Sequence, residues 1–308
     1  MSPRIRPTAY LFATLAVAGT LTACGGDPLD SGSDSDSGSG TIVVGSANFP
    51  ESELLMEMYA QALEAEGIKV ETKPNIGSRE VYMEAFKSGD IDLLPEYNGA
   101  LLAYLKPDGV PEDVSAPEDV YEALQDVLPE GSETLPQSEA EDKDTLTVSK
   151  ETAEKYSLKS IEDLAPVAKD LTLGGAPEFK TRHQGLVGLE EVYGVTFKEF
   201  KPLDAGGPLT SSALKKGDID VANIFSTDSQ IPTNGWLVLE DPKNLFLSQN
   251  VVPLIRSEAL SGDAETALNA VSEALTTDNL TEALAKVQVD KADPATVAKE
   301  FLADNGVN

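Results

Sequence analysis

One α/β unit occurs twice in this chain, and this repeat constrains the fold more than any other feature. The runs Lys-Ser-Gly-Asp-Ile-Asp at 87–92 and Lys-Lys-Gly-Asp-Ile-Asp at 215–220 are nearly identical. Upstream of each, an apolar run leads into a related segment, Gly-Ser-Ala-Asn-Phe at 45–49 and Gly-Ala-Pro-Glu-Phe at 175–179. Solenoid repeats are much shorter than this spacing, so it predicts two similar lobes. Two lobes imply a cleft, and small molecules bind in clefts between domains.

Strand and helix patterns alternate through both copies. Apolar residues at helical spacing in 51–66 predict a helix between strands at 41–45 and 68–73. Such alternation predicts an α/β fold with a mostly parallel sheet and flanking helices in each lobe. The other expected strands are 91–94, 144–148, 219–225 and 251–256, and the other expected helices are 78–87, 98–105, 117–127, 186–193, 211–216, 264–275, 281–287 and 294–302.

The same patterns predict where the lobes begin and end. Residues 41–143 and 251–308 are expected to form lobe 1, and residues 144–250 are expected to form lobe 2. The chain would then cross between the lobes twice, so the two crossings should form a hinge.

The N-terminus has the features of an export signal. Two arginines precede an apolar stretch and small residues, which predicts a signal peptide over residues 1–23. Cys24 is the only cysteine, and its position after Leu-Thr-Ala resembles the bacterial lipobox, in which the cysteine is lipidated. The alternative is a plain signal peptide with a leftover thiol. We expect an extracytoplasmic protein, lipid-anchored to the outer face of the cell membrane.

A segment rich in Gly, Ser and Asp follows this cysteine. Residues 24–40 contain too few apolar side chains to fold, so we expect Cys24 to carry the lipid on a flexible linker.

The charge balance restricts the partners of the chain. It contains 53 acidic against 23 basic residues, for a formal net charge of −30. Nucleic-acid binding is excluded, because phosphate neutralisation needs a basic surface. An acidic surface favours the approach of cationic solutes, although it also keeps an exported protein soluble.

Candidate ligand residues lie where strands end. In open α/β sheets ligands bind beyond the carboxyl ends of the strands, which selects four loops, two from each copy. These loops and the start of the helix at 78 contribute the candidates Asn48, Phe49, Ser78, Tyr97, Asn98, Arg182 and Thr227. Arg182 suits an anionic group. Tyr97 is equally compatible with packing, and core packing is the simpler role for Phe49.

Catalytic signatures are missing from the sequence. His183 is the only histidine and stands beside Arg182. The chain contains no Gly-x-Ser-x-Gly elbow, no phosphate-binding Gly-x-x-x-x-Gly-Lys loop and no Cys/His cluster for zinc. We therefore expect a binding protein without metal or cofactor rather than an enzyme.

Taken together, these segments resemble the solute-binding lipoproteins of ABC importers, in the branch that binds glycine betaine, choline and related osmoprotectants. The resemblance rests on residues 45–51, 87–97, 150–156, 177–182 and 225–228. It implies a two-lobed periplasmic-binding-protein fold of type II that closes on a small molecule. It also implies ABC permease and ATPase subunits as partners, and a monomer.

The resemblance also implies roles for individual residues. In this family aromatic side chains surround the quaternary ammonium, and an arginine meets the ligand carboxylate. Tyr97 matches one tyrosine of that cage, Arg182 matches the arginine, and Asp142 falls near an acidic position. Where the family tends to have its other cage tyrosines, this chain has Asp144, Ser211 and either Gln249 or Asn250. Ala47 stands where a lysine is common, and Ala100 where a threonine is common.

These departures leave several hypotheses open. A cage with one aromatic side chain would bind betaine-like osmolytes weakly. Alternatively, the site binds a more polar solute through Asp144, Ser211 and Asn250. A third possibility is a surface ligand sensor that no longer takes part in transport.

Overall fold

A computed structural model describes residues 40–107, 109–111 and 114–307. The predicted signal peptide, Cys24 and most of the predicted linker lie outside the described residues. Within the described part, no helix is long and apolar enough to cross a membrane.

The described chain alternates strands and helices in the predicted manner. In chain order the elements are β1 (Ile42–Gly45), α1 (Pro50–Ala65), β2 (Val70–Lys73), α2 (Arg79–Ser88), β3 (Leu93–Tyr97), α3 (Asn98–Leu105), α4 (Pro117–Gln125), β4 (Ser132–Thr134), β5 (Asp144–Val148), α5 (Lys150–Tyr156), η1 (Ile161–Leu164), η2 (Ala168–Asp170), β6 (Thr172–Gly175), η3 (Pro177–Lys180), η4 (His183–Val187), α6 (Gly188–Tyr193), β7 (Glu199–Pro202), α7 (Pro208–Lys216), β8 (Val221–Phe225), α8 (Gln230–Asn234), β9 (Leu237–Val238), β10 (Val251–Arg256), α9 (Gly262–Ala274), α10 (Thr277–Gln288) and α11 (Pro294–Asp304).

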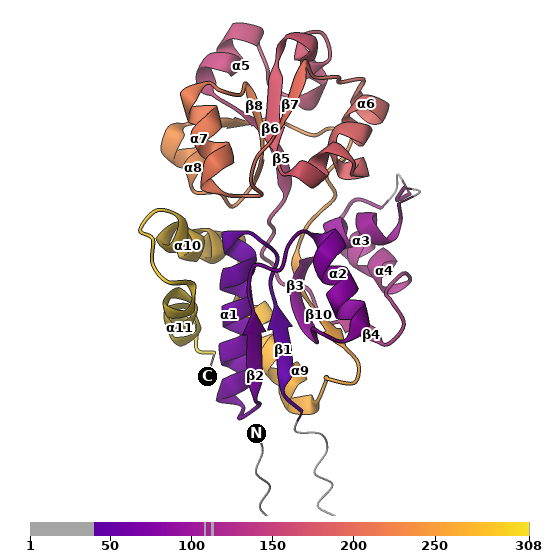
Figure 1. Ribbon diagram of the computed structural model, residues 1–308, viewed down its shortest axis with the longest axis vertical. Helices are drawn as coiled ribbons and strands as arrows, with labels where there is room; N and C mark the ends of the chain where they lie inside the picture. Colours follow the sequence, from indigo (N-terminus) through magenta and orange to yellow (C-terminus); the bar gives the residue numbers. More distant parts are fainter. Residues whose placement is uncertain (1–39, 108, 112–113, 308) are drawn as a thin grey trace, which may run out of the picture. The chain divides into compact units, whose positions relative to one another are not determined.

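These elements form two five-stranded sheets with the same topology (Figure 1). The first has the order β2-β1-β3-β10-β4 and the second β7-β6-β8-β5-β9. In each sheet four strands share one direction, and the fourth strand in the order, β10 or β5, runs antiparallel to both of its neighbours. The predicted α/β fold with a mostly parallel sheet in each lobe is therefore confirmed.

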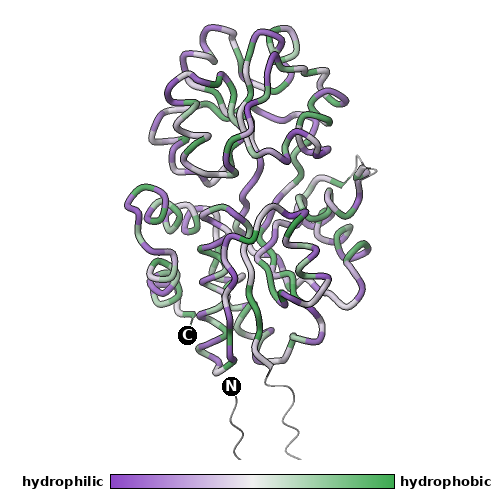
Figure 2. The backbone as a smooth tube through the Cα atoms, viewed as in Figure 1, coloured by the Kyte–Doolittle hydropathy of each residue, from purple (hydrophilic) through white to green (hydrophobic). Residues whose placement is uncertain are grey.

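Helices cover both faces of each sheet and bury its apolar side chains. On the first sheet, α1, α9, α10 and α11 enclose one core, while α2, α3 and α4 enclose another. On the second sheet, α5 and α6 pack against one core and α7 and α8 against a smaller one. Figure 2 shows the hydrophobic residues concentrated along the central strands. This burial of strands on both faces is expected of sheets built from parallel units.

The twin Gly-Asp-Ile-Asp runs make the same turn in both lobes. Gly89 and Gly217 end α2 and α7 in the left-handed conformation, with φ of 81° and 73°. The second aspartate of each run then accepts a hydrogen bond from the backbone of a neighbouring strand, 2.9 Å from Val43 N to Asp92 and 2.8 Å from Thr172 N to Asp220. The repeated motif is therefore structural.

One expected boundary is wrong. Residues 95–98 were expected to form a loop, but β3 continues through Pro95 to Tyr97. Pro95 lies opposite Pro253, and the antiparallel pairing continues on both sides of these two prolines. As a result Glu96 becomes a fully buried strand residue, and Asn98 begins α3.

Two further differences concern irregular segments. Strand β4 pairs with β10 in a region for which only one helix was expected. The helix expected at 186–193 begins at Gly188, because Gln184 and Gly185 have non-helical backbone angles.

Candidate functional site

A pocket with about 660 Å³ of empty space, its open mouth included, collects residues from both sheets. Its lining comprises Ala47, Asn48, Phe49, Ser78, Arg79, Tyr82, Tyr97, Ala100, Asp142, Asp144, Ala176, Glu178, Phe179, Arg182, Gln184, Ala205, Asn223, Phe225 and Gln249. The pocket lies where β1, β3, β6 and β8 end, which is the position predicted from the topology.

Five aromatic side chains line this pocket: Phe49, Tyr82, Tyr97, Phe179 and Phe225. The ring of Phe49 lies 6.0 Å from that of Tyr97 and 5.1 Å from that of Phe225, measured between centroids. The family pattern led us to expect one aromatic side chain, so the pocket is richer in aromatic rings than the sequence indicated. Such rings can attract a cation that has lost its water.

A buried ion pair lies under the pocket. The guanidinium of Arg79 donates to both carboxylate oxygens of Glu96, at 2.9 Å from Nε and 2.9 Å from Nη2. Tyr82 donates its hydroxyl to the same carboxylate at 2.6 Å. Burial would lower the pKa of Arg79, but the negative charge of Glu96 outweighs burial and raises it. Arg79 therefore stays charged, and its hydrogen bonds to Glu96 engage it inside the protein.

A second buried cluster joins two carboxyl groups through one hydroxyl. Thr227 Oγ1 lies 2.6 Å from Glu51 Oε2 and 2.9 Å from Asp142 Oδ1. Tyr97 donates to the other oxygen of Glu51 at 2.7 Å. A hydroxyl has one proton to donate, so one of the two carboxyl contacts requires a proton on the carboxyl group. Burial raises the pKa of both acids, and the charge of Glu51 further raises that of Asp142, which agrees with a shared proton.

Asp144 presents a carboxylate held only by amides. Asn223 donates to its Oδ1 at 2.9 Å and Gln249 to its Oδ2 at 3.4 Å. Within the described residues, neither Asp144 nor Asp142 forms an ion pair with lysine or arginine.

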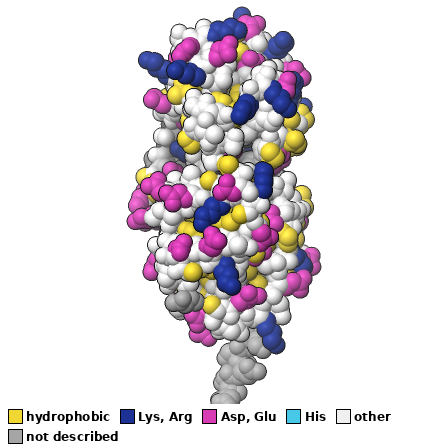
Figure 3. Space-filling model, turned by 90° about the vertical axis from the view of Figure 1, so that its left-hand side faces the viewer, with side chains coloured by type: hydrophobic (Ala, Val, Ile, Leu, Met, Phe, Trp, Pro, Cys, Tyr) yellow, Lys and Arg dark blue, Asp and Glu magenta, His cyan; other side chains and the backbone are white. Residues whose placement is uncertain are grey.

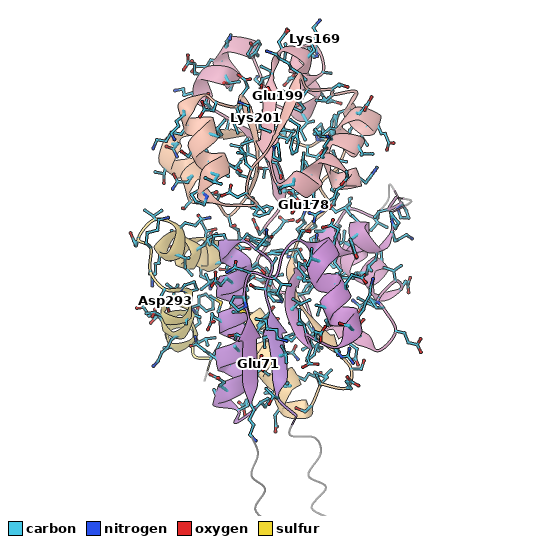
Figure 4. All side chains as sticks on the ribbon, viewed as in Figure 1. Glu71, Lys169, Glu178, Glu199, Lys201 and Asp293 are labelled. Carbon is cyan, nitrogen blue, oxygen red and sulfur yellow. The ribbon has the colours of Figure 1, made fainter. Side chains whose placement is uncertain are left out.

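Arg182 stands at the pocket between two carboxylates. It donates to Glu80 through Nε and Nη2 at 2.9 and 3.0 Å, and its Nη2 lies 3.9 Å from Glu178. Glu178 lies in η3, just after β6 (Figure 4). Partial burial would raise the pKa of Glu80, but Arg182 and the Ser78 hydroxyl lower it to about 2.

The sequence matches the family described as the substrate binding domain of ABC-type glycine betaine transport systems over residues 40–304. The chain belongs to this family. It is therefore an extracytoplasmic substrate-binding component of an ABC transporter of the glycine betaine, choline and carnitine class.

Relatives agree with this assignment. A carnitine transport binding protein, OpuCC of Listeria monocytogenes, is 29% identical over 275 residues, covering 86% of this chain and 87% of the relative. A glycine-betaine-binding protein of Pseudomonas aeruginosa is 27% identical over 279 residues, covering 86% and 88%. A crystal structure titled as a glycine betaine/carnitine/choline ABC transporter superposes with a TM-score of 0.68 at 26% identity, covering 86% of this chain and 99% of that one. The type II periplasmic-binding-protein fold is confirmed.

Seven of the residues proposed from the sequence meet in this pocket: Asn48, Phe49, Ser78, Tyr97, Asp142, Asp144 and Arg182. Ser78 occupies the N-cap position of α2 as expected, but its hydroxyl donates to Glu80 at 2.6 Å instead of capping the helix.

The other four proposed residues do not line it. Thr227 lies beneath the pocket in the cluster with Glu51. Asn98 and Asn250 are buried and join each other, with Asn250 N donating to Asn98 Oδ1 at 2.9 Å. Ser211 lines a neighbouring hollow and lies 3.3 Å from Asp228. These side chains are engaged in internal hydrogen bonds.

Several lining residues were not proposed from the sequence, notably Arg79, Tyr82, Asn223 and Phe225. Phe225 had a signal, because the repeat aligns it with Tyr97 at the end of the equivalent strand. No sequence pattern pointed to Arg79 or Tyr82. Their roles became evident only from the position of Glu96 inside β3, because a buried carboxylate needs a partner.

Proposed function

We propose that the pocket binds a small quaternary-ammonium solute and that the protein delivers it to its permease. The observation that carries this proposal is the meeting, in one pocket of a family member, of five aromatic side chains with Asp144, which forms no ion pair within the described residues. The ammonium group would lie against Phe49, Tyr97 and Phe225, with Asp144 supplying long-range attraction. Rings favour a cation by about 0.5–2 kcal/mol each, depending on desolvation.

Closure around the ligand would use the two crossings as a hinge, with lobe 1 formed by 41–143 and 251–308 and lobe 2 by 144–250. Residues 141 and 250 pair in an antiparallel bridge, so the crossings run beside each other. A ligand that contacts both lobes stabilises the closed state, because it binds that state more tightly than the open one. The chain would act as a monomer and without enzymatic activity.

Calorimetric titration of the purified full chain with choline, glycine betaine, carnitine and an ergothioneine-like betaine tests the proposal. At least one of these ligands should bind. Phe49→Leu and Phe225→Leu keep apolar volume but remove the ring, and each should weaken binding about tenfold. Phe197→Leu is the matched control, because Phe197 is half-buried in the core of the second sheet and lies outside the pocket lining. If none of the four ligands binds, or the three variants behave alike, the proposal is wrong.

We also propose that Cys24 carries a lipid after removal of residues 1–23, which would tether the binding domain to the outer face of the membrane. The support is the lipobox-like sequence before the only cysteine. Cys24→Ser should move the protein from the membrane fraction to the soluble fraction of cells. Unchanged fractionation would exclude the anchor.

A further inference from the structure

Two arginines line the pocket, and both are already neutralised. Arg79 is held by the buried carboxylate of Glu96 through two parallel hydrogen bonds. Such a pair cannot release its cation to a ligand without leaving Glu96 as an uncompensated buried charge, which is strongly unfavourable. Arg79 is therefore unavailable to a ligand carboxylate.

Arg182 is accessible but is also engaged. Its Nε–Nη2 edge, the edge that grips a carboxylate in a fork, is occupied by Glu80 from the first turn of α2. Glu178 lies 3.9 Å from Nη2. The positive charge of Arg182 thus lies between the negative charges of Glu80 and Glu178, and the net charge of these three side chains is negative.

On the pocket wall, Asp144 adds a carboxylate without a basic partner in the described part of the chain. Beyond the pocket, Figure 3 shows acidic side chains scattered over one face of the molecule with basic ones among them. At the pocket itself, the carboxylates of Asp144, Glu178 and Glu80 outnumber the single charge of Arg182, so the local charge is negative.

We propose that Glu80 is a specificity-determining residue that withholds Arg182 from the ligand, so that the pocket prefers a quaternary-ammonium cation with an uncharged tail over a zwitterion with a carboxylate. This inference rests on the proposed function, because it presumes that a quaternary ammonium enters this pocket.

The physical reason is competition for one guanidinium. A ligand carboxylate must either displace Glu80 from Arg182 or remain near Asp144 and Glu178 without a cation. An uncharged hydroxyl or amide on the ligand needs no cation, so it neither has to displace Glu80 nor is repelled by the two carboxylates. Because the Glu80 side chain is 43% exposed, its pair with Arg182 is worth little, and the discrimination it provides should be moderate.

The test uses glycine betaine and its amide, in which a neutral carboxamide replaces the carboxylate at nearly the same size, with choline as a third probe. Calorimetry on the wild-type chain should show the amide and choline binding about tenfold more tightly than glycine betaine. In Glu80→Gln, glycine betaine should bind about fivefold more tightly than in the wild type, while the amide and choline change little.

Glu84→Gln is the matched control. Glu84 lies on the same helix, pairs with Lys87 at 3.1 Å and is outside the pocket lining, so its substitution should leave all three affinities unchanged. Thermal unfolding of both variants checks that each is folded.

The outcomes separate the two proposals. If glycine betaine binds the wild type as tightly as its amide, or if Glu80→Gln leaves their ratio unchanged, the role of Glu80 is wrong while quaternary-ammonium binding stands. If none of the three probes binds the folded wild type, the proposed function fails and this inference fails with it.

Discussion

The two lobes share a frame and differ in what that frame presents to the pocket. In both, a helix ends at a left-handed glycine and an aspartate then accepts a backbone hydrogen bond from the neighbouring strand, Asp92 in one lobe and Asp220 in the other. A lysine of the edge strand also donates to the backbone of the same turn, Lys73 to Asp90 O and Lys201 to Asp218 O. The repeat therefore preserves the hydrogen bonds that join helix, turn and strand.

The strand ends differ. Where β3 ends in Glu96 and Tyr97, β8 ends in Ile224 and Phe225. In the first lobe a buried carboxylate orders Arg79 beneath the pocket, whereas the second lobe has an apolar residue at the equivalent position. The duplicated frame thus places loops of both lobes at one pocket, while divergence at the strand ends makes that pocket chemically asymmetric.

The largest difference between the lobes should appear at Glu96 and Ile224. Glu96→Gln leaves Arg79 buried without its counter-charge and should lower the free energy of unfolding by about 3–5 kcal/mol. Ile224→Val, at the equivalent strand position, removes only one methylene group and should cost about 0.5–1.5 kcal/mol. Urea unfolding followed by circular dichroism measures both. Similar losses of unfolding free energy would show that the buried charge of Glu96 matters no more to stability than the apolar side chain of Ile224.

The shared frame should respond alike in the two lobes. Asp92→Ala and Asp220→Ala each remove a carboxylate acceptor of a strand N–H and should each cost about 1.5–3 kcal/mol in urea unfolding. Asp218→Ala is the control, since that side chain is exposed and Asp218 contributes its backbone N–H and carbonyl oxygen to the turn. A loss confined to one lobe would contradict the equivalence of the two turns.

The buried carboxyl pair of Glu51 and Asp142, which the hydroxyl of Thr227 joins, should make stability depend on pH. Because burial raises the pKa of Glu51 and Asp142, the folded chain holds more protons than the unfolded chain once the pH exceeds about 4.5, the ordinary value for Glu51. Stability should therefore fall as the pH rises from about 4.5 toward the raised pKa values, by at most about 1.4 kcal/mol per pH unit for one proton.

Glu51→Gln imitates the protonated acid and should flatten this dependence in urea titrations between pH 4.5 and 7. Glu53→Gln, at a half-buried position on the same helix turn, should keep it. An equally steep profile in Glu51→Gln would mean that the pair does not share a proton.

The smallest expected effect concerns the two turn glycines. Gly217→Ala places a Cβ on a left-handed residue in open space and should cost about 1 kcal/mol. Gly89→Ala should cost slightly more, because its Cβ would lie 2.9 Å from the Arg256 guanidinium, which must move. Thermal unfolding resolves the difference, and a larger loss at Gly217 would contradict it.

Much of the fold follows from local patterns. The strands expected at 144–148 and 251–256 match β5 and β10. Their prediction needed only nearby residues, namely an apolar run with turn residues on either side. The repeat located the pocket for the same reason, since equivalent strands end at equivalent loops. The expected loop at 95–98 was wrong because Pro95 predicts a strand end unless its partner strand, here with Pro253, is known.

The sequence by itself thus indicated the duplicated frame, the family and the edge of the sheets at which the pocket lies, since these depend on periodicity and on short motifs. It did not reveal which charges in that site are already paired. Glu80 and Arg182 are 102 residues apart, and Glu51 and Thr227 are 176 apart, so no spacing along the chain predicts their contacts. Folding selects such pairs, because a charge or hydrogen bond is satisfied by whatever partner the packing of distant segments brings within about 3 Å.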